Sequence, residues 1–276
     1  GTHGNLGHGD TLNQFKPKLV EALGDYLVSE IACGAKHCMA RTQEFRVFSW
    51  GNGANGRLGH GDTSGCVVPK LVEALKNQRV LNIACGEGHS GCVTSEGEVY
   101  TWGAGSFGRL GHGIEKDTYT PAVIITLQGK RIYMLACGFR HNLALSIQGE
   151  VYSWGAGNYG VTGLFDIKDI QTMLTPLQVS FFQGKRVTQV AVGNFHSIAI
   201  TSVGEVYSWG YHGHGRLGLG SSVREDQAFP CKINSGIYGV TGGVRVVEKI
   251  AKIAGSKPKV NPQVKKDPWK VVRVEC

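Results

Sequence analysis

Hydrophobic residues along the chain occur in short runs of five or six positions, separated by turns that contain glycine. Three consecutive runs, Val80–Cys85, Ser90–Thr94 and Glu98–Trp102, are rich in β-branched and aromatic residues, a composition that favours strands over helices. Glycine adopts positive φ without steric cost, so it suits the tight turns that join antiparallel strands. The pattern predicts a three-stranded antiparallel unit, to which the segment that begins at Pro69 adds an outer strand.

The same unit recurs along the chain, with tryptophans 52, 52 and 55 residues apart. Each copy contains a segment of the type Val-Tyr-Ser-Trp-Gly. A proline and an Ala-Cys-Gly-x-x-His segment, which reads Ala-Val-Gly-x-x-His in the fourth copy, precede it. The repeated residues are Trp50, Trp102, Trp154 and Trp209; His37, His89, His141 and His196; and Pro17, Pro69, Pro121, Pro176 and Pro230. One four-stranded sheet cannot bury its own faces, so sheets of this kind stack around a central axis as the blades of a β-propeller.

Complete repeat units occupy four segments, and a partial unit follows them. The complete units lie at 17–51, 69–103, 121–155 and 176–210, and the partial unit lies at 230–248. Gly1 aligns with Gly53, so the chain begins inside a further unit. We therefore predict an all-β protein, a β-propeller of four-stranded antiparallel blades over residues 1–248, with about four complete blades and partial ones at both ends. Such an open arc is expected to be part of a larger chain or complex.

Composition excludes several classes of protein. No stretch approaches the ~18 apolar residues that a bilayer-spanning helix needs, so no transmembrane segment is predicted. Of the eight cysteines, Cys33, Cys85 and Cys137 recur in Ala-Cys-Gly at one period, which predicts small core residues in separate blades, too far apart for disulfides. This cysteine usage favours a reducing, intracellular compartment, either cytoplasmic or nuclear. The other cysteines show no CxxC spacing, so no metal site is predicted.

Three recurring motifs together resemble a known repeat. Gly-x-x-His, Gly-Glu-Val-Tyr-Ser-Trp-Gly and Gly-Arg-Leu-Gly-His-Gly are similar to the repeat of the regulator of chromosome condensation family, over roughly residues 1–230. The resemblance implies a propeller of about seven blades. Some proteins that resemble this family carry stacked Gly-Trp-Arg-His-Thr motifs, which are absent here. The matching positions are Ala35-Lys36, Glu87-Gly88, Phe139-Arg140 and Asn194-Phe195.

The resemblance implies several classes of function, because one propeller fold serves different tasks. Founding members of the family are guanine-nucleotide exchange factors for a nuclear small GTPase and bind nucleosomes. Others recognise substrates for HECT-type ubiquitin ligases, and others are scaffolds. We predict a non-enzymatic protein-interaction scaffold that binds a protein partner on a propeller face, with a small GTPase among the candidates. The alternatives are nucleotide exchange on a small GTPase and substrate recognition for a HECT-type ubiquitin ligase.

Two motifs that suggest catalysis or cofactor binding recur with the fold itself. The segments 51–56, 103–108 and 155–160 match Gly-x-Gly-x-x-Gly, but no helix-forming sequence follows them to hold a pyrophosphate. The repeated histidines lie one period apart and cannot cluster, so we predict that each fastens its own turn by a hydrogen bond to the backbone. No catalytic residue and no cofactor is predicted.

Departures from the repeat are more informative about partners, because the repeated positions serve the fold. In one unit Arg-Leu-Gly-His-Gly-Asp is replaced by Val161–Asp166, and Ile167–Met173 follows. This segment contains the apolar residues Leu164, Phe165 and Ile167. We predict that they form either an exposed apolar contact loop or a contact with the neighbouring blade. The sequence supports the two alternatives equally.

The C-terminal segment 249–276 is strongly basic. Its eight basic residues are Lys249, Lys252, Lys257, Lys259, Lys265, Lys266, Lys270 and Arg273. Only Asp267 and Glu275 oppose them, so the segment holds +6 of the chain's net charge of +8. Three prolines disfavour a long helix here. We predict an extended basic arm that either contacts an acidic protein, nucleic acid or chromatin, or anionic lipid, or is a solvated tail.

Overall fold

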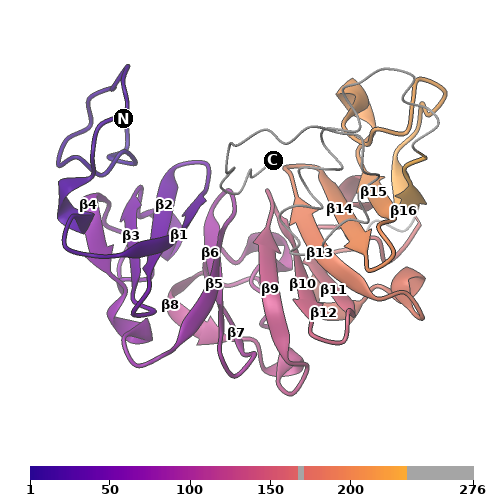
Figure 1. The fold of residues 1–276 in the computed structure, drawn as a ribbon, viewed down its shortest axis with the longest axis horizontal. Coiled ribbons are helices and arrows are strands. Elements are labelled where there is room, and N and C mark those ends of the chain that lie inside the picture. The colour runs from indigo at the N-terminus through magenta and orange to yellow at the C-terminus, as the bar shows by residue number, and fades with distance from the viewer. Residues whose placement is uncertain (167–170, 235–276) are drawn as a thin grey trace, which may run out of the picture.

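The computed structural model describes residues 1–166 and 171–234, which form four antiparallel sheets of four strands each. The sheets stand side by side in sequence order as the blades of an open arc (Figure 1). Within each blade the strands follow one another in sequence, from the innermost strand at the axis to the outermost. The predicted all-β propeller with four complete antiparallel blades is confirmed.

The four blades have closely matching elements. Blade 1 contains β1 Val28–Cys33, β2 His37–Thr42, β3 Val47–Gly51 and β4 Cys66–Leu71. Blade 2 contains β5 Val80–Cys85, β6 His89–Thr94, β7 Val99–Gly103 and β8 Thr118–Val123. Blade 3 contains β9 Ile132–Cys137, β10 His141–Ser146, β11 Val151–Gly155 and β12 Met173–Gln178. Blade 4 contains β13 Val187–Val192, β14 His196–Thr201, β15 Val206–Gly210 and β16 Gln227–Lys232. The 3-10 helices of the described residues are η1 Glu21–Leu23, η2 Ala54–Gly56, η3 Glu73–Leu75, η4 Ser106–Gly108, η5 Ile125–Leu127, η6 Asn158–Gly160, η7 Ser180–Phe182 and η8 Gly213–Gly215.

The outermost strand of each blade contains the repeated proline. Pro69 lies in β4, which pairs with β3 of blade 1. The prediction that this segment adds the outer strand to the unit of residues 80–102 is therefore wrong, because β8 pairs with β7 there and the Pro69 segment completes the preceding blade. Proline has no amide hydrogen to donate to a neighbouring strand. An outermost strand pairs on one side only, so proline there costs the fewest hydrogen bonds. Residues 235–276, which include most of the partial unit at 230–248 and the whole basic arm, lie outside the described residues.

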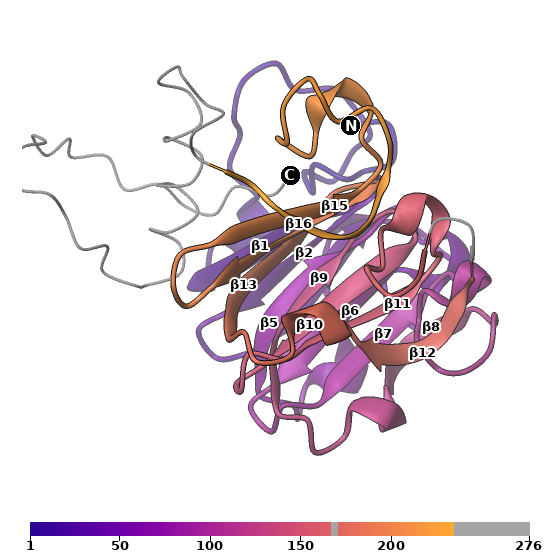
Figure 2. The same ribbon diagram turned by 90° about the vertical axis from the view of Figure 1, so that its right-hand side faces the viewer.

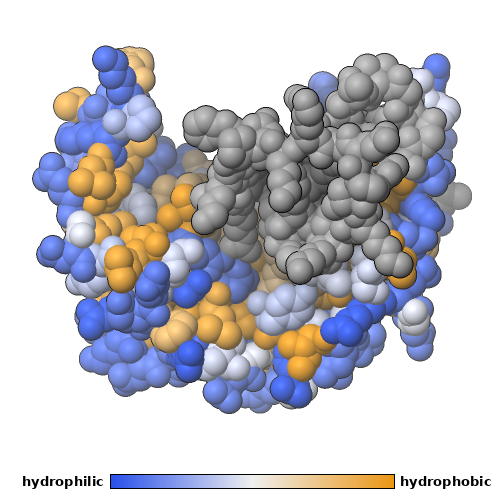
Figure 3. All heavy atoms as spheres, in the orientation of Figure 1, coloured by the Kyte–Doolittle hydropathy of each residue, from blue (hydrophilic) through white to orange (hydrophobic). Residues whose placement is uncertain are grey.

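Stacking of the blades builds the core. Val80 and Ile83 on β5 are 0% and 1% exposed because blade 1 covers them, whereas Val28 and Ile31 at the same positions of β1 are 39% and 56% exposed. Burying one such side chain contributes about 1.5–3 kcal/mol, so neighbouring blades stabilise each other. Figure 2 shows the stacked sheets from the side, and Figure 3 shows hydrophobic residues among the hydrophilic ones over blade 1.

The repeated tryptophan connects each blade to a loop of the blade before it. The Trp154 indole nitrogen donates to the carbonyl oxygen of Arg109 at 3.1 Å. Gly111 has a φ of 75°, and a Cβ there would lie only 2.9 Å from the same indole nitrogen. This position therefore requires glycine both for its conformation and for space. The same contact recurs between Gly7 and Trp50, Gly59 and Trp102, and Gly163 and Trp209.

The repeated cysteines lie at the propeller axis. Cys33, Cys85 and Cys137 end the innermost strands β1, β5 and β9, and they line a hollow between the blades. They lie in separate blades, as predicted. They were also predicted to be core residues, but they lie at the edge of the core that faces the propeller axis. Cys33 is exposed and the other two are half-buried. Successive side chains of a strand point to opposite faces, so the burial of Ala32 places Cys33 outside.

Candidate interaction surface

A chain of hydrogen bonds that begins at the repeated histidine connects each blade to the next. His89 Nε2 lies 2.7 Å from Asn142 Oδ1 in blade 3, and Asn142 Nδ2 donates to the carbonyl oxygen of Arg109 at 2.8 Å. The amide oxygen can only accept, so the His89 Nε2 atom carries the proton. The Arg109 carbonyl thus accepts hydrogen bonds from both Asn142 and Trp154. This oxygen is therefore one of the points at which blade 3 is bonded to blade 2.

The same connection occurs at two other blade junctions. His37 Nε2 lies 2.8 Å from Ser90 Oγ, which donates to the Arg57 carbonyl at 2.8 Å. His141 Nε2 lies 3.0 Å from Ser197 Oγ, which donates to the carbonyl of residue 161 at 2.8 Å. We predicted that each histidine bonds the backbone of its own turn, and this prediction is wrong for these three histidines. The partner is a side chain that follows the equivalent histidine of the next blade.

Burial keeps these histidines neutral. Desolvation lowers the pKa of His37, His89 and His141 from 6.5 to about 3. The arginines near them lower the pKa of His37 and His89 further. Each of these rings is buried and neutral, and its Nε2 atom is hydrogen-bonded to the next blade. The rings therefore stabilise the fold and are not available as proton donors or acceptors for an external substrate.

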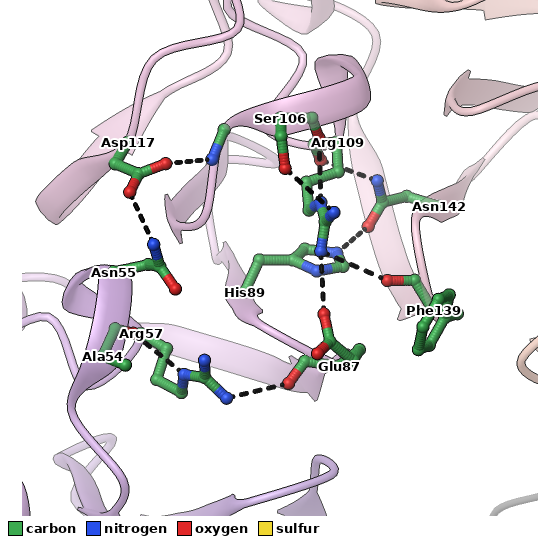
Figure 4. Close-up of polar contacts among 11 residues, drawn as sticks. Ala54, Asn55, Arg57, Glu87, His89, Ser106, Arg109, Asp117, Phe139 and Asn142 are labelled. Carbon is green, nitrogen blue, oxygen red and sulfur yellow. Dashed lines mark hydrogen bonds and ion pairs between the residues drawn. The ribbon is translucent and has the colours of Figure 1, made fainter.

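The turns between the first two strands of each blade and the loops after the third strand meet on one face of the propeller, which we call the loop face. At the junction of blades 1 and 2 this face contains two buried arginines on either side of Glu87 (Figure 4). Arg109 Nη1 lies 3.0 Å from Glu87 Oε2, and Arg57 Nη1 donates to the Glu87 backbone carbonyl at 3.1 Å. Asp117 accepts hydrogen bonds from Asn55 and from the backbone amide of residue 105. These charged side chains hold the loops in place through their hydrogen bonds and ion pair.

Four aromatic rings form a continuous row farther along the loop face, over blades 3 and 4. Phe139 packs against Phe195 with centroids 5.3 Å apart, and Phe195 packs against Tyr159 at 5.7 Å. Tyr159 packs against Tyr211 at 4.9 Å. We call these four residues the aromatic row. Tyr159 is 40% exposed and the other three are half-buried, so the row presents apolar edges to solvent at the surface of the propeller.

An arginine lies at each end of the aromatic row. The guanidinium carbon of Arg140 is 4.1 Å from the Phe107 ring centroid and 5.0 Å from that of Phe139. The guanidinium carbon of Arg216 is 4.7 Å from the Tyr211 ring centroid. Stacking on an aromatic face restricts the guanidinium plane while leaving its N–H groups free to bond at the edge.

The loop tips hold bulky residues in the left-handed conformation. Phe107, Tyr159 and His214 have φ of 60°, 62° and 61°, and Asn55 has φ of 59° at the same repeat position. Asparagine tolerates this conformation, whereas a bulky side chain in it costs on the order of 1 kcal/mol. Asn55 shows that the fold accepts asparagine here. The ring of Phe107 stacks with the guanidinium groups of Arg109 and Arg140, and the ring of Tyr159 belongs to the aromatic row.

The repeats supply an internal control for the aromatic row. The turn positions that correspond to Phe139 and Arg140 contain Ala35 and Lys36, Glu87 and Gly88, and Asn194 and Phe195 in the other blades. Blades 1 and 2 form the same sheets without a ring in this turn. Aromatic residues at these positions are thus not required for blade formation.

The residues predicted as a contact loop are only partly described. Leu164 and Phe165 are half-buried, and both pack against the core around Trp154. This placement agrees with the alternative of packing onto neighbouring blades. The third residue, Ile167, lies outside the described residues, as do Lys257, Lys259, Lys265, Lys266, Lys270 and Arg273 of the basic arm.

The described segments contain no group of three or more histidine, cysteine, aspartate or glutamate side chains arranged to hold a metal ion. The Gly-x-Gly-x-x-Gly segments lead into η2, η4 and η6, each of three residues. Such short elements supply no aligned helix dipole for a pyrophosphate. Within residues 1–166 and 171–234, no helix combines the length and the apolar character needed to cross a membrane.

Comparison with known proteins places this geometry in context. The family profile described as the RCC1-like domain matches residues 1–255. The ultraviolet-B receptor UVR8 of Arabidopsis thaliana is 36% identical over 233 residues, which cover 84% of this chain and 52% of the receptor. The E3 ubiquitin-protein ligase HERC2 of Homo sapiens is 40% identical over 227 residues, which cover 80% of this chain and 5% of the ligase.

A solved structure shows the same fold. Prp20p of Saccharomyces cerevisiae, described together with its binding properties to Gsp1p and histones, is similar with a TM-score of 0.67 and 26% identity. The similarity covers 77% of this chain and 52% of Prp20p. The chain thus spans about half the length of UVR8 and of Prp20p, and a small part of HERC2.

Proposed function

Because the chain belongs to the family of RCC1-like domains, we propose that it is a protein-interaction propeller that binds a partner on its loop face through the aromatic row. The observation that carries this proposal is the row itself, with an arginine at each end. Tyrosine, phenylalanine and arginine are among the residues enriched in protein interfaces. At the turn position of Phe139, the other blades have the small or polar residues Ala35, Glu87 and Asn194.

The proposal gives the domain no catalytic role. The repeated histidines support this assignment, because they are buried and bonded between blades. The distribution of Cys33, Cys85 and Cys137 over three blades supports an intracellular location. Cytoplasmic and nuclear locations are both compatible with it.

Two alternatives draw support from relatives. The likeness to Prp20p, which has described binding properties to Gsp1p, favours nucleotide exchange on a small GTPase. The likeness to HERC2 favours substrate recognition within a HECT-type ubiquitin ligase. A scaffold is expected to leave the release of labelled GDP from a panel of small GTPases unchanged. Accelerated release from any member would establish the exchange alternative in place of the scaffold.

Tyr159→Asn tests the loop face directly. The substitution relieves the left-handed strain but removes two aromatic contacts, so the free energy of unfolding should stay within about 1 kcal/mol of the original. Binding of partner proteins captured by the immobilised chain should fall by about 10-fold or more. The control is Phe229→Ser, which removes an exposed aromatic residue from the outer strand β16. Equal capture by both variants would remove the loop face from the proposal.

The basic arm stays a prediction as a second contact. Deleting residues 255–276 should weaken binding to an acidic partner and flatten its dependence on salt concentration, because fewer counterions are then released. The measurement is the dissociation constant between about 50 and 200 mM salt, from which the slope of its logarithm against the logarithm of salt concentration is obtained. Unchanged affinity and slope would identify the arm as a solvated tail.

A further inference from the structure

We propose that the loop face binds an acidic peptide segment, with Arg140 and Arg216 each pairing with a carboxylate and the aromatic row holding an apolar side chain between them. This inference rests on the proposed function, since it names the chemistry of the partner on the same surface. It is carried by the placement of two guanidinium groups at the two ends of one apolar row.

Arg140 is a charged group held in place without a carboxylate. Its guanidinium lies between the rings of Phe107 and Phe139, and its Nε atom is buried with no hydrogen-bond partner among the described residues. Packing between two rings fixes the guanidinium, so a carboxylate that pairs with its terminal nitrogens meets a side chain already held in place. The planar N–H edge of a guanidinium matches the two oxygens of a carboxylate.

Arg216 supplies the second charge at the far end of the row. Its Nε donates to the carbonyl oxygen of residue 213 at 2.8 Å, and its guanidinium stacks on Tyr211. The backbone bond uses one donor and fixes the direction of the side chain. Four N–H groups remain on the two terminal nitrogens, and no ion pair of Arg216 occurs among the described residues.

Three acidic residues of the loop face already have partners. Glu87 pairs with Arg109. Glu115 accepts the backbone amide of residue 107, and Asp226 accepts the backbone amide and Nδ1 of His212. The positive charges of Arg140 and Arg216 are thus not neutralised within the described chain. A ligand of opposite charge complements this part of the loop face.

The geometry of the aromatic row favours a peptide over a nucleic acid. Base stacking needs open ring faces, but neighbouring rings in the row meet at interplanar angles of 56°, 76° and 45° and cover one another's faces. Tilted rings instead form a surface of edges, against which an aliphatic or aromatic side chain packs. A second copy of the chain is disfavoured, because two loop faces would bring like charges together.

The test is selection of a phage-displayed library of random 12-residue peptides on the purified chain. Selected peptides should be enriched in aspartate and glutamate around an apolar residue. Arg140→Gln and Arg216→Gln should each weaken a selected peptide by about 10- to 100-fold, the usual loss for a charge-assisted pair. The matched control is Lys36→Gln, which removes a charge from the same repeat position as Arg140 in blade 1, where no aromatic row exists. It should change the affinity by less than about 2-fold.

Arg140→Lys separates a paired guanidinium from simple attraction between charges. Lysine keeps the charge but has no planar fork, so affinity should lie near that of Arg140→Gln. Full affinity with lysine would overturn the proposed pairing. Selected peptides without an excess of acidic residues, or an equal loss in Lys36→Gln, would also overturn it.

The same selection distinguishes failure of this inference from failure of the proposed function. Peptides that lack acidic residues but lose binding in Tyr159→Asn would overturn the inference and leave the interaction surface in place. Peptides that bind equally well to Tyr159→Asn would overturn both. If the chain binds a 20-nucleotide oligothymidine and Arg140→Gln abolishes this binding, the ligand is nucleic acid and not a peptide. If light scattering shows a dimer that Arg140→Gln abolishes, the ligand is a second copy of the chain.

Discussion

Gly111→Ala is expected to lower the free energy of unfolding by about 2–5 kcal/mol. Gly111 has a φ of 75°, a conformation that costs an alanine about 1–2 kcal/mol. The added methyl group would also lie 2.9 Å from the Trp154 indole nitrogen and 3.2 Å from an Ile124 methyl group. Forcing a methyl group into a packed core costs a further 1–3 kcal/mol or so. The blade junction would therefore lose both its packing and part of its indole hydrogen bond.

Gly129→Ala is the matched control for this experiment. Gly129 has a φ of 76°, but no atom lies within 4 Å of the position of its Cβ. Only the conformational cost then remains, about 1–2 kcal/mol. Urea denaturation of the two variants, followed by tryptophan fluorescence, measures the difference directly. Equal losses in the two variants would mean that contact with the tryptophan contributes nothing at the junction.

The fold could be predicted from the periodic residues because each of them has a local structural role that recurs in every blade. Glycine in the loop, proline in the outermost strand and alternating hydrophobic residues all act within one unit or between adjacent units. Strand β5, Val80–Cys85, has the predicted bounds, and β6 and β7 differ from prediction by one residue at their ends. Periodicity could not predict the partner of the histidine. His89 and Asn142 are 53 residues apart and meet only after two blades have stacked.

The aromatic row illustrates the same limit for the candidate site. Phe139, Tyr159, Phe195 and Tyr211 come from turns and loops of two blades, and no short segment of sequence contains more than one of them. The signal was present as aromatic residues at turn positions where other units have alanine, glutamate or glycine. The sequence instead favoured Leu164 and Phe165, because they interrupt the most regular motif. Those two side chains pack inward, so an interrupted motif can equally reflect a local change in the core.

Stability is expected to fall steeply as the pH drops from 6.5 to 5. Desolvation lowers the pKa of His37, His89 and His141 to about 3 in the folded protein, whereas the unfolded chain has the ordinary value near 6.5. Between these values the unfolded chain binds protons that the folded chain does not, so acidification favours unfolding. Stability is fully present above pH 6.5 and decreases toward pH 3. When all three take up a proton on unfolding, their own contribution to the slope approaches about 4 kcal/mol per pH unit. Burial also lowers the pKa of His60, His112 and His196, which adds to the slope in the same direction.

The range from pH 6.5 to 5 isolates the histidines, because carboxylates in unfolded chains titrate mainly below it. Urea denaturation at intervals of half a pH unit gives the slope, and His89→Gln identifies its source. Glutamine can still donate to Asn142 Oδ1 but takes up no proton, so the slope should fall by up to about 1.4 kcal/mol per pH unit, although stability at pH 7 also falls. His214→Gln is the matched control for the same substitution at an exposed position. An unaltered slope in His89→Gln would show that the buried rings do not govern acid unfolding, and the blades would then separate at low pH for another reason.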